Sequence, residues 1–161
     1  MEISRAESRE IDTIMHVYVS ARETMIRSGN PLQWREGYPT RELILKDIES
    51  GWLYVCRQNG RLVGCFALLD EEDDTYKDLY DGAWLNDRPC SVVHRLAVLE
   101  TRLGVGAFCI HWCLNACSDI KVDTHADNLP MQRLLEAKGF QRCGKVRNSW
   151  GDERIAFQIS R

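Results

Sequence analysis

The chain has 161 residues, of which 44% are hydrophobic, and a formal net charge of -3 at pH 7. A chain of this length typically forms one core, so we predict a single domain over residues 1–161. The negative net charge argues against nucleic acid as a partner, because a protein needs a basic surface to neutralise the phosphates of nucleic acid. No apolar run approaches the roughly 20 residues of a spanning helix, which argues against a membrane partner.

The opening segment MEISRAESRE contains neither an apolar stretch nor a small-residue cleavage site, so we expect a cytoplasmic protein. The seven cysteines form no CxxC pair. Cys109, Cys113 and Cys117 recur at helical spacing, which is typical of small buried side chains. The end pair would lie about 12 Å apart along a helix that rises about 1.5 Å per residue. We therefore predict no metal site.

The first half of the chain begins with two predicted helices. Residues 7–26 place apolar side chains on one stripe, as an amphipathic helix packed on a core does: Ile11, Ile14, Met15, Tyr18 and Met25. The segment 29–39 is rich in glycine, proline and aromatic residues, which indicates a loop. Thr40 then provides an N-cap for a helix over 41–50, which Gly51 ends.

A β-hairpin is predicted after the second helix. Two β-rich segments, 52–58 and 61–70, are joined by Asn59-Gly60, the strongest short signal for a hairpin turn. The acidic residues 70–74 come next and indicate a solvated loop, because their crowded carboxylates lack the spacing of a calcium-binding loop.

The second half of the chain alternates strands and helices. The helix that follows Gly104 is apolar almost all round, and its polar stripe includes His111, which we expect to face water. Asn128 is the N-cap of a further helix, which Gly139 ends. The remaining predicted elements are strands: 91–98, 120–125, 140–147 and 153–160.

The strand at 91–98 runs into a glycine-containing turn, RLGVGA, at the start of a helix. First-turn N–H groups of a helix lack internal partners, the helix dipole is positive there, and glycines let a ligand approach. Such a helix start binds anions, and Arg102 adds a positive charge that favours a diphosphate. Cys109 replaces the third glycine of a dinucleotide-binding G-x-G-x-x-G, and no G-K-[ST] of a Walker A motif follows.

Two segments resemble the GNAT family of N-acetyltransferases. Residues 92–112, VVHRLAVLETRLGVGAFCIHW, look like the strand, pyrophosphate loop and helix of its acetyl-CoA motif. Residues 122–140, VDTHADNLPMQRLLEAKGF, look like the strand and Asn-led helix of its next motif. The resemblance implies an α/β fold with element order β, α, α, β, β, β, α, β, α, β, β. The sheet would be mixed, mostly antiparallel and of about seven strands, with a central splay and four flanking helices.

The resemblance further implies an acetyl-CoA-dependent N-acetyltransferase that passes an acyl group directly to a primary amine of a small molecule or peptide. It also allows a homodimer. In the family, the strands that correspond to those bearing Val98 and Asp123 part and open a slot for the cofactor. The residues implied to bind acetyl-CoA are Leu96, Ala97 and Val98 through their backbone, Arg102, Leu103, Gly104, Val105, Gly106 and Ala107 through the loop amides, and Asn128 at the edge of the slot.

Two positions depart from the family pattern. Thr101 rather than Arg102 occupies the first position of the pyrophosphate loop, which weakens the role of the arginine side chain but not that of the amides. Leu135 stands where many members carry the tyrosine that protonates the leaving thiolate. A non-catalytic module of the same fold, which binds or senses an acyl-CoA, is therefore the alternative function.

Amine attack on a thioester requires a base, since a lysine-like amine with a pKa of about 10.4 is mostly charged at neutral pH. His94, on the strand that leads into the cofactor motif, is the first candidate, although a histidine satisfied at the sheet surface explains it equally well. Asp123 and His125 alternate onto one face of the next strand. They either form a carboxylate–imidazole pair or are polar residues that line the splayed sheet.

Four residues are predicted to select the acceptor amine: Gln33, Trp34, Tyr38 and Trp84. Aromatic walls hold an amine by cation–π contact and exclude water. Both tryptophans have an alternative role, which is to cover the edge of the core. We favour that alternative for Trp84, whereas two aromatic residues in a polar loop favour a functional role for Trp34 and Tyr38.

Overall fold

The computed structural model describes residues 1–70, 74–99 and 103–161. Its helices are α1 (Ile11–Arg27), α2 (Arg41–Glu49), α3 (Val105–Ala116) and α4 (Leu129–Ala137), with the 3-10 helices η1 (Ser8–Glu10) and η2 (Asp74–Asp78). The strands are β1 (Glu2–Arg5), β2 (Leu53–Gln58), β3 (Arg61–Leu69), β4 (Ser91–Val98), β5 (Asp119–Thr124), β6 (Gln141–Arg147) and β7 (Glu153–Ser160). The described α-helices and strands follow one another in the predicted order.

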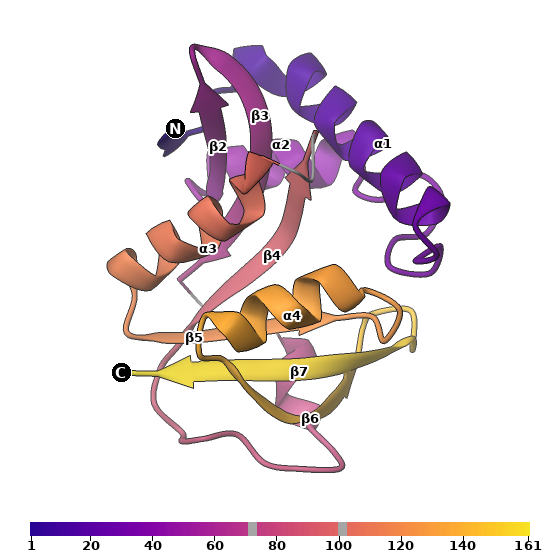
Figure 1. Cartoon of the computed structure of the whole chain (residues 1–161), viewed down its shortest axis with the longest axis vertical. Coiled ribbons are helices and arrows are strands. Elements are labelled where there is room, and N and C mark those ends of the chain that lie inside the picture. The colour runs from indigo at the N-terminus through magenta and orange to yellow at the C-terminus, as the bar shows by residue number, and fades with distance from the viewer. Residues whose placement is uncertain (71–73, 100–102) are drawn as a thin grey trace.

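The strands form one seven-stranded sheet in the order β1-β2-β3-β4-β5-β7-β6. Every pairing is antiparallel except that between β4 and β5. These two parallel strands share only the pairs Ser91–Ile120 and Val92–Lys121, after which they separate (Figure 1). The predicted mixed sheet with a central splay is therefore confirmed, and the splay opens towards the C-terminal ends of β4 and β5.

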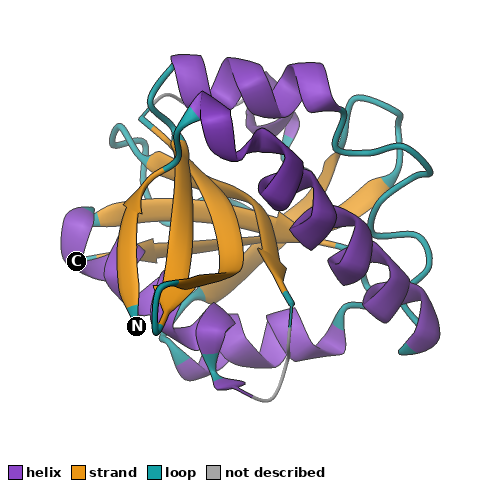
Figure 2. Ribbon diagram, turned by 90° about the horizontal axis from the view of Figure 1, so that it is seen from above, coloured by secondary structure: helices purple, strands orange, loops and turns teal. Residues whose placement is uncertain are grey.

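The helices cover both faces of the twisted sheet and make a core on each (Figure 2). On one face, α1 and α2 bury Ile14, Tyr18 and Ile44, which are at most 1% exposed. On the other face, α3 and α4 bury Ile110 and Leu135 completely. Burial of a large apolar side chain contributes about 1.5–3 kcal/mol, so the sheet is held in place from both sides.

Local sequence signals set the ends of several elements, as predicted. The Thr40 hydroxyl accepts a hydrogen bond from a first-turn N–H at 3.2 Å and begins α2. Asn128 Oδ1 accepts one at 3.4 Å and begins α4. Asn59 and Gly60, with φ of 50° and 77°, make the tight turn between β2 and β3 that the right-handed twist of a hairpin favours.

The acidic segment 70–74 is predicted to be a solvated loop, and its described residues, Asp70 and Asp74, are both exposed. Residues 71–73 lie outside the described residues. Asp74–Asp78, however, form η2, and this short helix buries the Tyr76 side chain completely. Tyr76 thus packs the residues that follow the acidic segment against the core.

α3 packs most of its surface into the core. Cys109, Ile110 and Cys113 are at most 1% exposed, whereas His111 is exposed, as predicted. The cysteines serve as small apolar side chains, because burial raises the pKa of Cys109 and of Cys113 and keeps both thiols neutral. Over the described ranges no helix, α3 included, has the length and apolar character needed to cross a membrane.

We expect the native protein to resist thiol modification everywhere except at Cys117. All seven cysteines fall within the described ranges and are free, and Cys117 is the one that is not fully buried. Burial raises the pKa of the Cys65 thiol to about 12, so only about one such thiol in ten thousand is ionised at about pH 8. Iodoacetamide labelling read by mass spectrometry tests this, with urea-denatured protein as the control in which every site reacts. Labelling of Cys65 or Cys109 as fast as Cys117 in the native protein would contradict this packing.

Candidate active site

The first-turn amides of α3 have no hydrogen-bond partner within the described part of the chain. Gly104 precedes the helix at a φ of 69°, a left-handed conformation that glycine adopts without strain, and no side chain of the described residues caps it. Within those residues, the first N–H that bonds back is that of Phe108, to the Gly104 carbonyl at 3.0 Å. Among the described residues, the preceding amides of Val105, Gly106 and Ala107 have no hydrogen-bond acceptor, which is the arrangement that binds anions at helix starts.

These residues adjoin a cavity of about 320 Å³, here called the slot. Its walls come from the end of α1 (Thr24 to Asn30), from Leu96 and Val98 of β4, from the start of α3 (Gly104 to Ala107) and from the start of α4 (Asn128 to Leu134). Most of the lining is apolar. The slot therefore suits a slender chain that ends in a negatively charged group at α3.

Some of the predicted cofactor-binding residues line the slot, whereas others are buried in the core or lie beside the slot. Ala97 and Val105 are each 1% exposed and bury their side chains in the core, so only their backbone is available. Leu103 is 43% exposed beside the slot, and Arg102 lies outside the described residues. The residues that line the slot are Leu96, Val98, Gly104, Gly106, Ala107 and Asn128.

A second cavity of about 320 Å³, here called the chamber, adjoins the slot. The two cavities share the wall residues Met25, Leu96, Asn128 and Met131. Leu96 belongs to β4 and Asn128 follows β5, so the junction lies where these strands have parted. The chamber lining that matters for chemistry is Gln33, Trp34, Tyr38, His94, Arg95, Asp123, Trp150 and Arg154.

A bulge in β4 turns consecutive side chains into the chamber. Alternate residues of a regular strand face opposite sides of the sheet, yet His94, Arg95 and Leu96 all line this cavity. Arg95 has a φ of 55°, and the register between β4 and β3 shifts at this point. A left-handed arginine costs on the order of 1–3 kcal/mol, so its surroundings must hold it in place.

A buried ion pair with α2 holds Arg95. Its Nε donates to Asp47 Oδ2 at 2.9 Å and its Nη2 lies 2.7 Å from the same oxygen, while the two side chains are 9% and 2% exposed. The guanidinium also donates to the Tyr38 hydroxyl. Burial raises the pKa of Asp47 against the opposing charge of Arg95, and burial likewise raises the pKa of the Tyr38 phenol. The bulge is thus tied both to α2 and to the loop 29–39.

His94 and Asp123 face each other across the splay. His94 Nδ1 lies 3.7 Å from Asp123 Oδ1, and the two side chains are 16% and 13% exposed. The Tyr76 hydroxyl donates to the same Oδ1 at 2.7 Å, and its ring centroid lies 5.8 Å from that of the imidazole. Asp123 Oδ2 lies 4.0 Å from Nε of the buried Arg154. The carboxylate can therefore orient an imidazole that lines the chamber, with two supports, Tyr76 and Arg154, that the sequence does not reveal.

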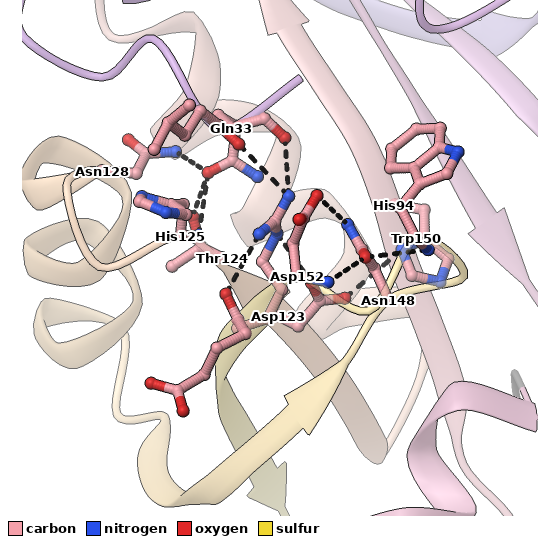
Figure 3. A network of polar contacts seen from close by, with 12 residues as sticks. Gln33, His94, Asp123, Thr124, His125, Asn128, Asn148, Trp150 and Asp152 are labelled. Carbon is pink, nitrogen blue, oxygen red and sulfur yellow. Dashed lines mark hydrogen bonds and ion pairs between the residues drawn. The ribbon is translucent and has the colours of Figure 1, made fainter. Parts of the chain in front are cut away.

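Gln33 fastens the loop 29–39 to the end of β5 (Figure 3). Its Oε1 accepts from Thr124 Oγ1 at 2.9 Å, from the His125 N–H at 2.9 Å and from Asn128 Nδ2 at 3.0 Å. Because these donors fix the carbonyl end of the carboxamide, its orientation is settled. Within the described residues Gln33 Nε2 has no partner, and it is free to donate into the chamber.

His125 makes different contacts from those predicted. Its Nδ1 accepts from the Asp127 N–H at 3.1 Å and lies 3.5 Å from Asp127 Oδ2. β5 ends at Thr124, so the alternation that would place His125 beside Asp123 ends with it. The imidazole that meets Asp123 is that of His94 instead, and His125 is not among the residues that line the chamber.

The aromatic residues of the loop 29–39 line the chamber, whereas Trp84 does not. Trp34 packs edge-on against Tyr38 with 6.2 Å between ring centroids, and Tyr38 packs against Trp150 at 4.9 Å. Trp84 lies at the edge of the core, with Lys121 Nζ 4.2 Å from its ring centroid. Trp84 thus covers the edge of the core, which is the alternative role that the sequence analysis favoured for it.

The turn between β6 and β7 closes one side of the chamber, and no local sequence signal assigns it to the site. Asn148 Oδ1 accepts from the N–H groups of Trp150 at 3.1 Å and Asp152 at 2.9 Å. Arg35 donates to both carboxylate oxygens of Asp152, at 3.2 and 2.9 Å, and joins the turn to the loop 29–39. That guanidinium holds the pKa of Asp152 below its usual range.

Comparison with solved structures finds matches over the whole chain. A GNAT-family acetyltransferase from Streptococcus agalactiae 2603 is 31% identical with a TM-score of 0.89, and the match covers 99% of this chain and 95% of that one. A GNAT-family acetyltransferase from Bacillus cereus ATCC 10987 is 21% identical with a TM-score of 0.68, over 99% and 96% of the two chains. The ribosomal-protein-alanine N-acetyltransferase from Brucella melitensis is 15% identical with a TM-score of 0.66, over 100% of both. These last two likenesses concern the fold alone. No protein-family model matches the sequence, and comparison with curated proteins gives no match.

Removal of the Asp47 carboxylate should destabilise the protein far more than removal of an exposed one. Asp47→Ala leaves the Arg95 guanidinium buried without its partner, which is expected to lower the free energy of unfolding by about 3–5 kcal/mol. Asp12→Ala breaks an exposed pair with Arg41, 2.6 Å long, and as the control should cost less than about 1 kcal/mol. Urea unfolding followed by circular dichroism measures both. Equal losses would show that the ion pair does not hold the bulge.

Proposed function

Because this chain belongs to the GNAT family of acetyltransferases, we propose that it is an acetyl-CoA-dependent N-acetyltransferase whose acceptor is a primary amine of a small molecule or peptide. The observation that carries the proposal is the junction of slot and chamber. The slot adjoins the open amides of α3, the chamber contains the His94–Asp123 pair, and both are lined by Leu96 at the splay. A thioester bound in the slot would there meet an amine bound in the chamber.

We assign the cofactor to the slot. Its diphosphate would bind the first-turn amides of α3 at Gly106 and Ala107, where the helix dipole favours negative charge. Its pantetheine arm would run along the edge of β4 beyond Val92, because β5 has parted from that edge. An unpaired strand edge binds an amide-containing chain as it would an added strand. Leu96 and Val98 would flank the arm.

The proposed reaction is a direct attack in a ternary complex. His94 takes a proton from the acceptor ammonium, and the freed nitrogen lone pair attacks the carbonyl carbon of the thioester. A backbone N–H near Val98 stabilises the oxyanion that forms. Collapse of the tetrahedral intermediate breaks the C–S bond and yields an N-acyl amine, while the nitrogen releases its second proton to solvent or to the departing sulfur.

Leu135 sets how the sulfur leaves. Its side chain is completely buried in the core beneath α4, so no proton donor acts from the position where many family members have tyrosine. A simple thiol has a pKa of about 8.5, and it can depart as the thiolate without a dedicated acid. The leucine is therefore compatible with turnover.

Acceptor selection is assigned to Gln33, Trp34 and Tyr38, with Trp150 added from the structure. Gln33 Nε2 would donate to a carbonyl or hydroxyl oxygen of the acceptor. The aromatic rings would present their faces to the ammonium group before it loses its proton. Together they favour a polar amine whose nitrogen points towards His94.

The two arginines of the chamber lining, Arg95 and Arg154, indicate which charge the acceptor can carry. Arg95 is bound to Asp47 and Tyr38. Arg154 donates from Nη2 to the carbonyls of Leu32 at 3.3 Å and Gln33 at 3.0 Å. Both guanidinium groups are already engaged, so neither is open to an acceptor carboxylate. This favours amines without a strong negative charge.

A non-catalytic acyl-CoA-binding module is the second candidate function, because Leu135 removes the acid used by many relatives. Thiol release measured with acetyl-CoA and a panel of amines separates the two. Tight acetyl-CoA binding without amine-dependent release from any of the amines would favour the binding module.

A negative charge in the first turn of α3 should affect stability and cofactor binding in opposite directions. Ala107→Glu places a carboxylate where the helix dipole favours it, and is expected to raise the free energy of unfolding by about 0.3–1 kcal/mol. The same carboxylate competes with the cofactor diphosphate, so the dissociation constant of CoA should rise at least about tenfold. Ala107→Gln, of equal size but uncharged, is the control for steric effects. Calorimetric titration and urea unfolding measure the two quantities, and equal CoA affinity in both variants would remove the diphosphate from this helix.

Loss of the base should slow turnover without loosening the cofactor. His94→Gln is expected to lower kcat at least about a hundredfold and to abolish the rise of kcat/KM with pH, because no imidazole is left to deprotonate. Asp123→Asn should lower kcat by a smaller factor, since it leaves the imidazole in place. His111→Gln, on the exposed face of α3, serves as the control. Thiol release across a pH series gives these values, and wild-type rates in His94→Gln would eliminate His94 as the base.

A further inference from the structure

Asn30 is a buried polar residue without a partner. Its side chain is 4% exposed, and neither Nδ2 nor Oδ1 has a hydrogen bond within the described residues. An unsatisfied buried polar group destabilises a protein by about 1–3 kcal/mol. Such groups in native structures call for an explanation, and a ligand that completes them is one.

The position of Asn30 is well defined. It follows the end of α1, and its backbone N–H donates to the Met25 carbonyl at 2.9 Å. Its neighbours Ser28 and Gly29 are exposed, whereas Asn30 is buried and is one of the residues that line the slot, together with Leu96 and Val98 of β4. The chain thus returns to the slot at this residue and places a carboxamide in a mostly apolar wall.

The other polar side chains of the slot are already engaged. Asn128 donates to Gln33 and accepts from the Met131 N–H. The Ser28 hydroxyl donates to the Thr24 carbonyl at 2.8 Å. Asn30 is therefore the slot residue whose donor and acceptor are both unused.

We propose that Asn30 binds the pantetheine arm of acyl-CoA and fixes its depth in the slot. This rests on the function proposed above, and it assigns the arm a side-chain contact from the loop after α1. The arm carries two amide groups between the thioester and the diphosphate, and an apolar wall alone would leave them without partners. Asn30 Nδ2 donates to a carbonyl oxygen of the arm, and Oδ1 accepts from an amide N–H. Because the arm ends at the thioester, Asn30 also positions the carbonyl carbon at the chamber.

The test compares acetyl-CoA with its nucleotide half in variants of Asn30. Asn30→Leu, of similar size, and Asn30→Ala each remove the carboxamide. Both should raise the dissociation constant of acetyl-CoA about five- to twentyfold, the effect of one or two lost hydrogen bonds. Adenosine 3′,5′-diphosphate lacks the arm, and its affinity should change less than twofold. Asn115→Ala removes an exposed carboxamide of α3 that lines neither cavity, and as the control it should leave both affinities unchanged.

Thermal unfolding of the free protein separates binding from a structural role. Asn30→Leu removes an unsatisfied group, so its Tm without ligand should equal or exceed that of the wild type. A lower Tm in both variants with unchanged acetyl-CoA affinity would overturn the proposal and make Asn30 structural. Equal weakening of acetyl-CoA and of the nucleotide half would also overturn it. Failure of the wild type to bind acetyl-CoA would instead refute the proposed function itself.

Discussion

β4 and β5 are neighbours in a continuous sheet, yet they are joined by only two residue pairs before they part. A strand that leaves its neighbour exposes backbone N–H and C=O groups, which are costly to bury unpaired. Here the exposed edge borders both the slot and the chamber, so the backbone that the sheet leaves unpaired becomes the backbone available to a ligand. The separation of these two strands is the constraint on which the proposed cofactor path, the junction of the two cavities and the position of His94 all depend.

The chamber is polar, but its charges are matched in pairs. Arg95 is neutralised by Asp47, and Arg154 lies beside Asp123. Burial of an unpaired charge would cost several kcal/mol, so the pairing allows these ionisable groups to be buried beside the chamber. They also connect parts of the chain that are far apart, α2 with β4 and β5 with β7. Within the described residues Gln33 Nε2 has no hydrogen-bond partner, and it stands beside these paired charges in the chamber lining.

Structural features that depend on neighbouring residues could be predicted from the sequence, whereas contacts between residues far apart in the sequence could not. Thr40, Asn128 and the Asn59-Gly60 turn act on residues next to them in the sequence. The helix starts and the hairpin turn that they form could therefore be predicted from the sequence. The strand–glycine–helix motif is local in the same sense. Tyr76 meets Asp123 across 47 residues of sequence, and Arg95 meets Asp47 across 48. Such contacts leave no periodic pattern in the sequence. The expected pairing of Asp123 with His125 assumed a strand that continues to His125, but β5 ends at Thr124.

Several polar groups have no protein partner among residues 1–70, 74–99 and 103–161. These are the first-turn amides of α3, the edge of β4 and the carboxamide of Asn30, and all of them border one slot. Each lowers the stability of the unliganded fold, and each is a place where a ligand gains a hydrogen bond without first breaking one. Binding there is accordingly linked to folding: a ligand that fills the slot stabilises the native state by mass action.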